Sequence, residues 1–209
     1  MEVVKGVHYI ESYAGSAVIT GDRLVLVDTG SEDNAKVILD SLAAIRWKPT
    51  DIATIIVTHT HPDHAGGLAT MKERTGAKVA AHEADADYIA RTKPYPGPPG
   101  PQRHRAAAVD VRLKDQQVFE GLLVIHGPGH TPGSIALLNR ERSLLIAGDT
   151  MRNEGGIGPM SDQYNIDAKQ HRQSMKKIAA YDFEALIVGH GPPIRAGAGK
   201  MLKAVAAKL

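Results

Sequence analysis

The chain contains no cysteine among its 209 residues. This absence excludes disulfides, thiolate nucleophiles, iron–sulfur clusters on cysteine ligands and zinc sites with sulfur ligands. Aromatic residues are scarce as well, at 4% of the chain. A tightly held metal must therefore be bound through nitrogen and oxygen atoms, for which the chain offers ten histidines.

A strong charge of one sign and a long apolar run are also missing. The 25 basic and 23 acidic residues are evenly mixed and leave a net charge of only +2, so no nucleic-acid-binding face is expected. No apolar stretch approaches the roughly 20 residues that span a bilayer, and residues 1–13 lack a basic region followed by an apolar one. We therefore expect a cytoplasmic protein without membrane contact.

The remaining composition, 43% hydrophobic and 23% charged, is that of a globular protein, and the length fits one domain over residues 1–209. Strands are predicted at 17–20, 24–28, 52–58, 78–82, 122–126, 134–139, 144–147 and 185–188. Helices are predicted at 33–46, 66–75, 84–91, 167–180 and 198–208. This alternation predicts an α/β fold in which two packed sheets carry helices on their outer faces.

One segment is compositionally unusual. Residues 91–105, RTKPYPGPPGPQRHR, contain five prolines between positions 94 and 101. Proline at this density excludes a helix or the interior of a sheet. The segment is either a lid over a site or a surface loop, and the sequence leaves both open.

Four side chains that commonly bind metals follow the strand predicted at 52–58. They are His59, His61, Asp63 and His64, in the run IIVTHTHPDHAGG. In an extended chain, side chains two residues apart point the same way, so His59 and His61 can reach one ion. The proline after His61 keeps it extended, after which Asp63 and His64 can turn toward a second ion. The glycine pair that follows allows close backbone approach as the next helix begins.

Three further segments repeat one design, a short apolar strand followed by a glycine turn that presents a ligand-type residue. They present His130 (LLVIHGPGHTPGS), Asp149 (LLIAGDT) and His190 (ALIVGHGPP). Strand ends that meet at one edge of a sheet are where active sites form in sheet-based folds. The sequence therefore predicts a metal centre of five histidines and two aspartates.

This order, His-x-His-x-Asp-His followed by His, Asp and His, resembles the metallo-β-lactamase superfamily of binuclear metallohydrolases. The segments LVDTG at 26–30, HTPGS at 130–134 and GDT at 148–150 match in the same order, so the resemblance covers most of the chain. It implies a four-layer αβ/βα sandwich of two mixed sheets. The ligand sets that it implies are His59, His61 and His130 for one metal, Asp63, His64 and His190 for the second, and Asp149 as a bridge.

The resemblance also implies that Asp28, in LVDTG, supports the metal cluster from behind its ligands. The other five histidines have no place in the motif set. His8, His104 and His171 lie in polar or loop contexts and are expected to be solvated. His82 and His126 end predicted strands and are expected to pack there, with a hydrogen bond to a ligand as the alternative.

Two divalent ions that share an oxygen can lower the pKa of water from about 15.7 to roughly neutral, so a metal-bridging hydroxide is the expected nucleophile. The ions also polarise the substrate carbonyl and stabilise its oxyanion, so no serine or cysteine triad is needed. Asp63 is the candidate catalytic carboxylate, because it can orient the hydroxide and carry its proton to the leaving group. The ligand types favour zinc and leave iron and manganese open.

The expected partner is a small-molecule substrate with an ester-type bond, a thioester or a lactone, and the same mechanism extends to promiscuous hydrolysis of β-lactams. The chain length favours such a substrate, because we expect 209 residues to leave no room for the helical C-terminal domain of longer hydroxyacylglutathione hydrolases or for the insertions of RNA-processing relatives. The sequence leaves open whether the protein is a monomer or a dimer.

Residues 91–105 and 151–164 are expected to frame the mouth of the site. The candidates to attract an anionic substrate are Arg91, Lys93, Arg103 and Arg105. Tyr95 or Tyr164 could donate a hydrogen bond near the metals, and Met151 could form an apolar wall together with Ile157 and Met160.

A second hypothesis is an oxidoreductase similar to the family's persulfide dioxygenases, with a single iron on His59, His130 and Asp149. The outer ligand positions can persist in such enzymes, so the ligand set allows both hypotheses. One iron per chain with oxygen uptake would indicate the dioxygenase. Two zinc ions per chain with oxygen-independent turnover would indicate the hydrolase.

Overall fold

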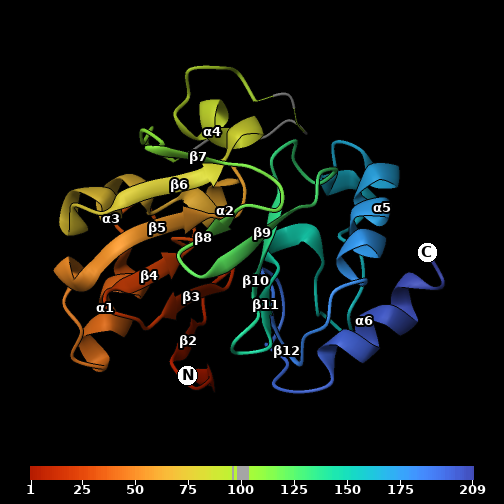
Figure 1. Cartoon of the computed structure of the whole chain (residues 1–209). Coiled ribbons are helices and arrows are strands. Elements are labelled where there is room, and N and C mark those ends of the chain that lie inside the picture. Colours follow the sequence, from red (N-terminus) through yellow and green to blue (C-terminus); the bar gives the residue numbers. More distant parts are fainter. Residues whose placement is uncertain (96, 98–103) are drawn as a thin grey trace.

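Two β-sheets pack face to face, with helices on both outer sides (Figure 1). The computed structural model describes residues 1–95, 97 and 104–209. Within these residues, one sheet has seven strands and the other has five. The two mixed sheets confirm the sandwich predicted from the sequence.

The seven-stranded sheet holds the first half of the chain. Its strands, in spatial order, are β1 (Glu2–Val4), β2 (Val7–Ile10), β3 (Ser16–Ile19), β4 (Leu24–Val27), β5 (Ile52–Val57), β6 (Lys78–His82) and β7 (Val111–Leu113). Neighbours are antiparallel from β1 to β4 and parallel from β4 to β7. Parallel neighbours need crossover connections, which here contain helices. These are α1 (Lys36–Ala44) with the 3₁₀ turn η1 (Pro49–Asp51), α2 (Pro62–Ala65) with α3 (Leu68–Thr75), and α4 (Glu83–Ile89).

The five-stranded sheet holds the second half of the chain. Its spatial order is β12 (Ala185–Ile187), β11 (Leu144–Ile146), β10 (Ile135–Asn139), β9 (Leu122–His126) and β8 (Val118–Phe119). Only the β11–β12 pair is parallel, and its connection contains η2 (Gly148–Thr150), η3 (Asp162–Tyr164) and α5 (Ala168–Ile178). The last helix, α6 (Ala198–Ala206), lies beside α5 on the outer face (Figure 1).

Three apolar layers hold the sandwich together. Alternate residues of a strand face opposite sides of its sheet. In β9, Leu122 and Val124 face the other sheet, whereas Leu123 and Ile125 face α5 and α6. A third layer lies between the seven-stranded sheet and the helices α1, α3 and α4. This arrangement is the predicted four-layer αβ/βα order.

The structure differs from the sequence predictions mainly in the short elements. Strands β1, β2, β7 and β8 have two to four residues and were not predicted. A strand this short is predicted only from a run of apolar residues, as in β11 (LLI) and β12 (ALI). Strands β1, β2 and β7 each contain a polar residue, and β8 has only two residues. The first predicted helix also begins three residues late, because Ala35 has a positive φ of 52° and directly precedes α1.

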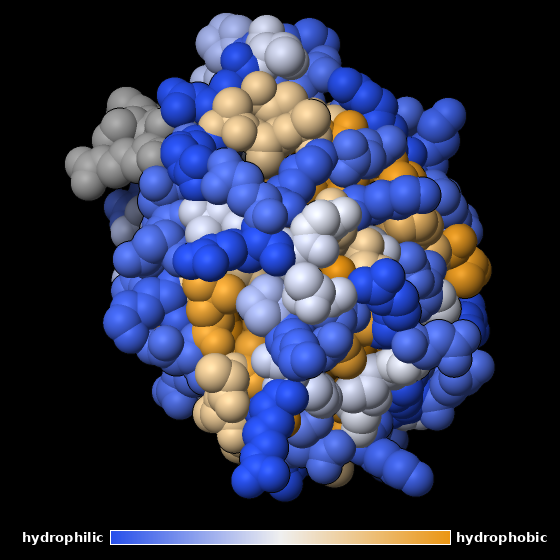
Figure 2. Space-filling view, turned by 90° about the vertical axis from the view of Figure 1, so that its left-hand side faces the viewer, coloured by the Kyte–Doolittle hydropathy of each residue, from blue (hydrophilic) through white to orange (hydrophobic). Residues whose placement is uncertain are grey.

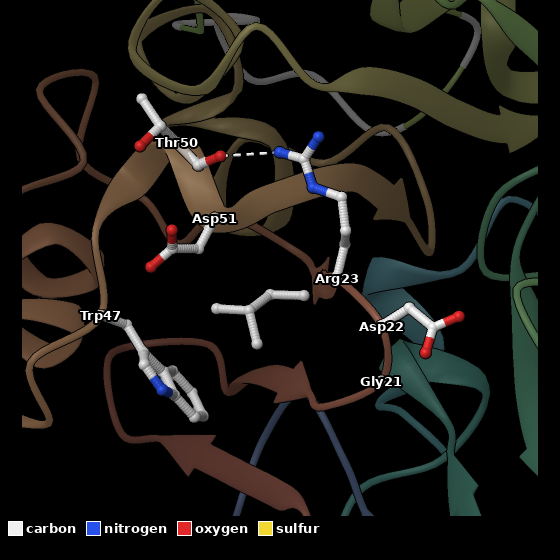
Figure 3. A pocket seen from close by; sticks show the side chains of 7 residues that line it. Gly21, Asp22, Arg23, Trp47, Thr50 and Asp51 are labelled. Atoms are coloured by element: carbon white, nitrogen blue, oxygen red, sulfur yellow. Dashed lines mark hydrogen bonds between the residues drawn. The ribbon is translucent and has the colours of Figure 1, made fainter.

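A pocket of about 470 Å³ lies where β4 and β5 begin. Trp47 and Asp51 line it, and Arg23 Nη2 donates a hydrogen bond to the backbone oxygen of Thr50 at 2.7 Å (Figure 3). The predicted ligands follow the other end of β5, so this pocket is separate from the candidate metal centre.

One face of the molecule is mostly polar. Figure 2 shows a face on which hydrophilic residues predominate, interrupted by smaller hydrophobic areas. Among the residues that the structure describes, no helix combines the length and the hydropathy needed to cross a membrane.

Candidate metal centre

The seven predicted ligands converge at one end of the sandwich, although they come from four separate segments. His59, His61, Asp63 and His64 follow β5 of the first sheet. The other three follow strands of the second sheet: His130 after β9, Asp149 after β11 and His190 after β12. Both sheets therefore contribute to the centre.

Local backbone features direct the first segment. His61 is extended, with φ −64° and ψ 148°, and Pro62 begins the single turn α2. Gly66 and Gly67 then pass close to the loop after β4. A Cβ atom on Gly66 would lie 2.6 Å from the backbone of Ser31, and one on Gly67 would lie 2.6 Å from the oxygen of Thr29. The glycine pair therefore permits the close approach that the sequence indicates.

The ligand atoms form two groups that share Asp149. One group contains His59, His61, His130 and Asp149; the other contains Asp63, His64, Asp149 and His190. Within each group the candidate ligand atoms lie within 4.8 Å of one another. Asp149 Oδ2 lies 3.3 Å from His130 Nε2 in the first group and 3.4 Å from His190 Nε2 in the second.

Several of these atoms lack a hydrogen bond of acceptable geometry to any residue that the structure describes. They are the buried Nε2 atoms of His59, His64 and His130, and Oδ1 of Asp149. Buried polar atoms without a partner are rare in folded proteins. Imidazole nitrogens and carboxylate oxygens that converge in this way fit two divalent cations.

The electrostatics differ between the two groups. Burial and the neighbouring imidazoles lower the pKa of His59 far below its ordinary value and that of His61 to about 3. Both rings are therefore neutral, as metal binding requires. In the second group, hydrogen bonds to Asp149 and Asp63 raise the pKa of His190 to about 10.

The carboxylates of Asp149 and Asp63 also act on His64. Burial alone would lower the pKa of His64, but the carboxylates of Asp149, Asp28 and Asp63 raise it well above its ordinary value. Conversely, burial would raise the pKa of Asp149, but His64 and the neighbouring imidazoles hold it far below its ordinary value. The carboxylates of the second group thus favour positive charge beside them, and a bound cation would replace the protons on His64 and His190.

Asp28 lies behind the ligands, where the sequence resemblance placed it. Its Oδ2 atom is 2.7 Å from His64 Nδ1. The same carboxylate accepts hydrogen bonds from the backbone N–H and the hydroxyl of Thr58, both at 2.7 Å. A carboxylate on the outer nitrogen of a histidine fixes the orientation of the ring.

Two other ligands are supported by residues from distant segments. His130 Nδ1 lies 3.0 Å from Asn165 Oδ1, and His61 Nε2 lies 2.7 Å from the hydroxyl of Tyr95. Tyr95 was expected to contact substrate, yet in the structure its hydroxyl is paired with a ligand. The sequence did not indicate Asn165, because a single asparagine in a loop carries no spacing signal.

The described basic residues of the segment 91–105, at positions 91, 93 and 105, contact neighbouring protein groups. Arg91 Nη1 donates to the backbone oxygen of His104 at 3.0 Å. Lys93 pairs with Asp87 at 2.7 Å. The Lys93 pair holds the start of the segment against α4, and the Arg91 contact joins the two ends of the segment. Arg103 lies outside the described residues.

Arg105 holds the end of the segment against the first sheet's helices. Its guanidinium donates to Asp33 and to Glu73, both at 2.9 Å, and to Thr70 Oγ1 at 2.6 Å. Asp33 lies just before α1, and Thr70 and Glu73 lie on α3. The contacts therefore hold the end of the segment against these two helices.

The segment 151–164 contributes both core and surface residues. Met151 has no exposed area and packs, with Ile157, in the layer between the second sheet and the helices α5 and α6. It therefore belongs to the core instead of forming an exposed wall. Met160 is also buried, whereas Tyr164 is 54% exposed and remains available to a ligand.

The predictions for the other histidines were partly wrong. His104 and His171 are buried, and His171 Nε2 accepts a hydrogen bond from the backbone N–H of Met160 at 3.1 Å. Both lie in polar sequence that tertiary packing covers. His82 and His126 do pack, as predicted, with their rings stacked 3.8 Å apart and 12° from parallel.

Comparison with known proteins places this geometry in a family. A model of the metallo-β-lactamase superfamily matches residues 14–190. A hydroxyacylglutathione hydrolase of Pseudomonas aeruginosa is 37% identical over 167 residues, which are 77% of this chain and 54% of that protein. A probable metallo-hydrolase of Bacillus subtilis, YflN, is 26% identical over 229 residues, 92% of this chain and 86% of that protein. The chain thus spans about half the length of the hydroxyacylglutathione hydrolases that it matches.

Solved structures agree in fold. A metallo-β-lactamase from Cronobacter sakazakii, a mutant in its HARLDQ motif, has a TM-score of 0.77 at 26% identity, covering 91% of this chain and 79% of that one. The metallo-β-lactamase SMB-1, in complex with mercaptoacetic acid, has a TM-score of 0.81 at 20% identity, covering 100% and 93%. The matched residues and the shared fold together show that this chain belongs to the metallo-β-lactamase superfamily.

Proposed function

We propose that the protein is a hydrolase that binds two divalent cations and cleaves a thioester or a lactone of a small molecule. The observation that carries the proposal is the position of the Asp149 carboxylate between two complete groups of ligand atoms. When bound, two such cations activate a water molecule as nucleophile and polarise the substrate carbonyl. Zinc is the favoured metal, and iron and manganese suit the same ligand types.

Asp63 is the residue that we propose moves the proton. Its side chain is 21% exposed, whereas that of Asp149 is 2% exposed, so Asp63 is the more accessible carboxylate of the two. Burial opposes its ionisation, but His64 and a hydrogen bond from His190 keep the pKa of Asp63 below its ordinary value. Asp63 Oδ2 is therefore ionised, and can accept a proton from an attacking water and pass it to the leaving group.

His190 shares the second ligand group with this carboxylate. Its Nε2 lies 3.1 Å from Asp63 Oδ2, so both atoms can reach one ion, and the ring of Tyr13 packs edge-on against His190 with centroids 5.5 Å apart. Tyr13 is 76% exposed, so solvent reaches the centre on the side of His190 and Asp63.

Two observations support the substrate class. Two relatives are named hydroxyacylglutathione hydrolase, and an acylglutathione is a thioester. Their names therefore favour a thioester as the substrate of this protein. Structural neighbours named metallo-β-lactamase support a promiscuous activity on β-lactams, because a strained amide carbonyl suits the same chemistry.

The test combines metal analysis with turnover. The purified protein should bind two zinc ions per chain and hydrolyse a hydroxyacylglutathione thioester or a lactone in preference to a phosphodiester. Asp149→Ala should lose both metals and lower kcat/KM by more than about a hundredfold, because the shared ligand is removed. His8→Ala changes a histidine on β2, outside the two ligand groups. This variant should keep both metal ions and the wild-type kcat/KM.

Three results would contradict the proposal. Full activity of Asp149→Ala would exclude the shared metal centre. One iron per chain with oxygen uptake would instead indicate a dioxygenase. An absence of turnover on thioester, lactone and β-lactam alike would exclude the proposed substrate class.

A further inference from the structure

Asp85 is a buried carboxylate that the motif set does not contain. It lies in the first turn of α4 and has no exposed area. Its partners among the described residues are three hydrogen-bond donors and no basic side chain. Thr60 N–H and the Thr131 hydroxyl donate to Oδ2 at 2.9 and 2.7 Å, and Gly133 N–H donates to Oδ1 at 2.6 Å.

The burial of this carboxylate is costly. Removal from water raises the pKa of Asp85 to about 6, although the three donors favour its charged form. An apolar side chain would fill the same space without desolvating a charge. A role in packing alone therefore does not explain an aspartate at this position.

The three donors belong to two loops, one from each sheet, and Asp85 connects them. Thr60 stands between His59 and His61, in the loop after β5 of the first sheet. Thr131 directly follows His130, and Gly133 lies two residues further along the same loop of the second sheet. One side chain thus connects the two loops that carry the three histidines of the first ligand group.

The geometry of those loops determines the spacing of the imidazoles. The ring of His130 lies 4.8 Å from that of His59 and 4.5 Å from that of His61, measured between centroids. The loops also share a backbone bond, from Ile135 N–H to Thr58 O at 3.1 Å, which lies next to His59 but five residues beyond His130. The Asp85 contacts, by comparison, adjoin histidines on both loops, through Thr60 and Thr131. Metal–ligand distances vary by only about 0.2 Å.

A carboxylate suits this position better than its amide would. All three partners are donors, and an asparagine would turn its NH₂ group toward at least one backbone N–H. The loop is also adapted to Asp85, since a Cβ atom on Gly133 would lie 2.5 Å from the Asp85 nitrogen. Glycine at 133 therefore permits the contact.

We propose that Asp85 is a positioning residue of the metal centre, which holds the His59–His61 loop against the His130 loop and so sets the geometry of the first ligand group. This inference rests on the metal centre of the proposed function. Asp85 itself does not contact the ligand atoms or the substrate.

The experiment measures binding of Co²⁺ and Zn²⁺ to the metal-free protein. Asp85→Asn should bind the first ion at least about tenfold more weakly than the wild type, and the visible absorption of bound Co²⁺, which reports ligand geometry, should change. Asp87→Asn is the matched control, because it removes a carboxylate from the same helix that pairs with Arg112 and Lys93 at the surface. It should bind Co²⁺ as the wild type does.

A second pair of variants removes one donor instead. Thr131→Val should weaken binding of the first ion, and Thr131→Ser, which keeps the hydroxyl, should restore both the affinity and the Co²⁺ spectrum. This pair of variants tests the positioning role of Asp85 even if Asp85→Asn fails to fold. Thermal unfolding of the metal-free proteins separates a loss of stability from a loss of ligand geometry.

The outcomes are distinct. If Asp85→Asn or Thr131→Val is less stable but binds Co²⁺ with wild-type affinity and spectrum, the positioning role is wrong and the metal centre stands. If the wild type itself binds neither Co²⁺ nor Zn²⁺, the metal centre and the role of Asp85 fall together.

Discussion

Four imidazoles of the candidate metal centre have a hydrogen-bonding partner outside the ligand set on one ring nitrogen. The pairs are His59 with Thr58, His64 with Asp28, His130 with Asn165, and His61 with Tyr95. Such partners fix the ring orientation and the tautomer. Asp28 is part of a recognisable motif, whereas Asn165 and Tyr95 reach the centre only through the fold.

Tyr95→Phe tests one of these contacts. The variant removes the hydroxyl that lies 2.7 Å from His61 Nε2 and keeps the ring. We expect about tenfold weaker binding of the first zinc ion and a loss of no more than about 1.5 kcal/mol in the free energy of unfolding. Competition with a chromophoric chelator measures the affinity.

Tyr88→Phe provides the control for that measurement. The ring of Tyr88 packs edge-on against Tyr95 with centroids 5.7 Å apart, so this variant also removes a hydroxyl from the neighbourhood. It should bind zinc as the wild type does. Equal affinity in Tyr95→Phe and the wild type would show that the hydroxyl does not support His61.

At the scale of elements, the junction between β6 and α4 is built around His82. Its Nδ1 atom accepts a hydrogen bond from the backbone N–H of Ala84 at 3.2 Å and thereby caps α4. Its ring stacks on His126, which ends β9. This junction links the two sheets beside the helix that carries Asp85.

The junction should weaken in acid. Burial, and then His126, lower the pKa of His82 to about 4 from an ordinary value of 6.5. As the pH falls below 6.5 the unfolded chain takes up a proton there before the folded protein does, so stability is lost between about pH 6.5 and 4. The loss from this one group is at most about 1.4 kcal/mol per pH unit.

His82→Asn should reduce that dependence. Asparagine retains a cap acceptor but does not titrate. The variant should be less stable than the wild type at pH 7, because the stack is lost, and the difference should narrow as the pH falls toward 4. Urea unfolding of both proteins at several pH values measures the difference in their free energies of unfolding. Two stability curves that stay parallel would show that His82 does not contribute.

At the scale of the whole molecule, the candidate metal centre lies between the two sheets. Four of its candidate ligands follow a strand of the first sheet and three follow strands of the second. Cations that bind only the folded protein stabilise it by mass action. We therefore expect metal binding to stabilise the packing of the two sheets.

Removal of metal with a chelator should lower the melting temperature of the protein, and zinc should restore it. At a free zinc concentration a hundred times the dissociation constant the gain is about 2.7 kcal/mol per site. Calorimetry of metal-free and zinc-loaded samples measures the shift. Asp149→Ala should not respond to zinc, and an unchanged melting temperature in the wild type would contradict this stabilisation by metal.

Much of the architecture and all seven candidate ligands could be predicted from local sequence, because strand alternation and short ligand spacings act within a few residues of the chain. The predictions failed where a residue's environment comes from elsewhere. His171 lies in polar sequence yet is buried, and Arg105 pairs with Asp33, 72 residues earlier in the chain.

The sequence by itself determined which side chains are available for metal chemistry: with no cysteine, they are histidines and aspartates at the ends of apolar strands. Only the tertiary structure decided how they are supported. Asp85 is an ordinary helical aspartate in the sequence, and it becomes a link between two ligand loops because the packing of two sheets brings Thr60 and Thr131 to its carboxylate. Contacts between segments this far apart depend on the complete fold, which no local pattern encodes.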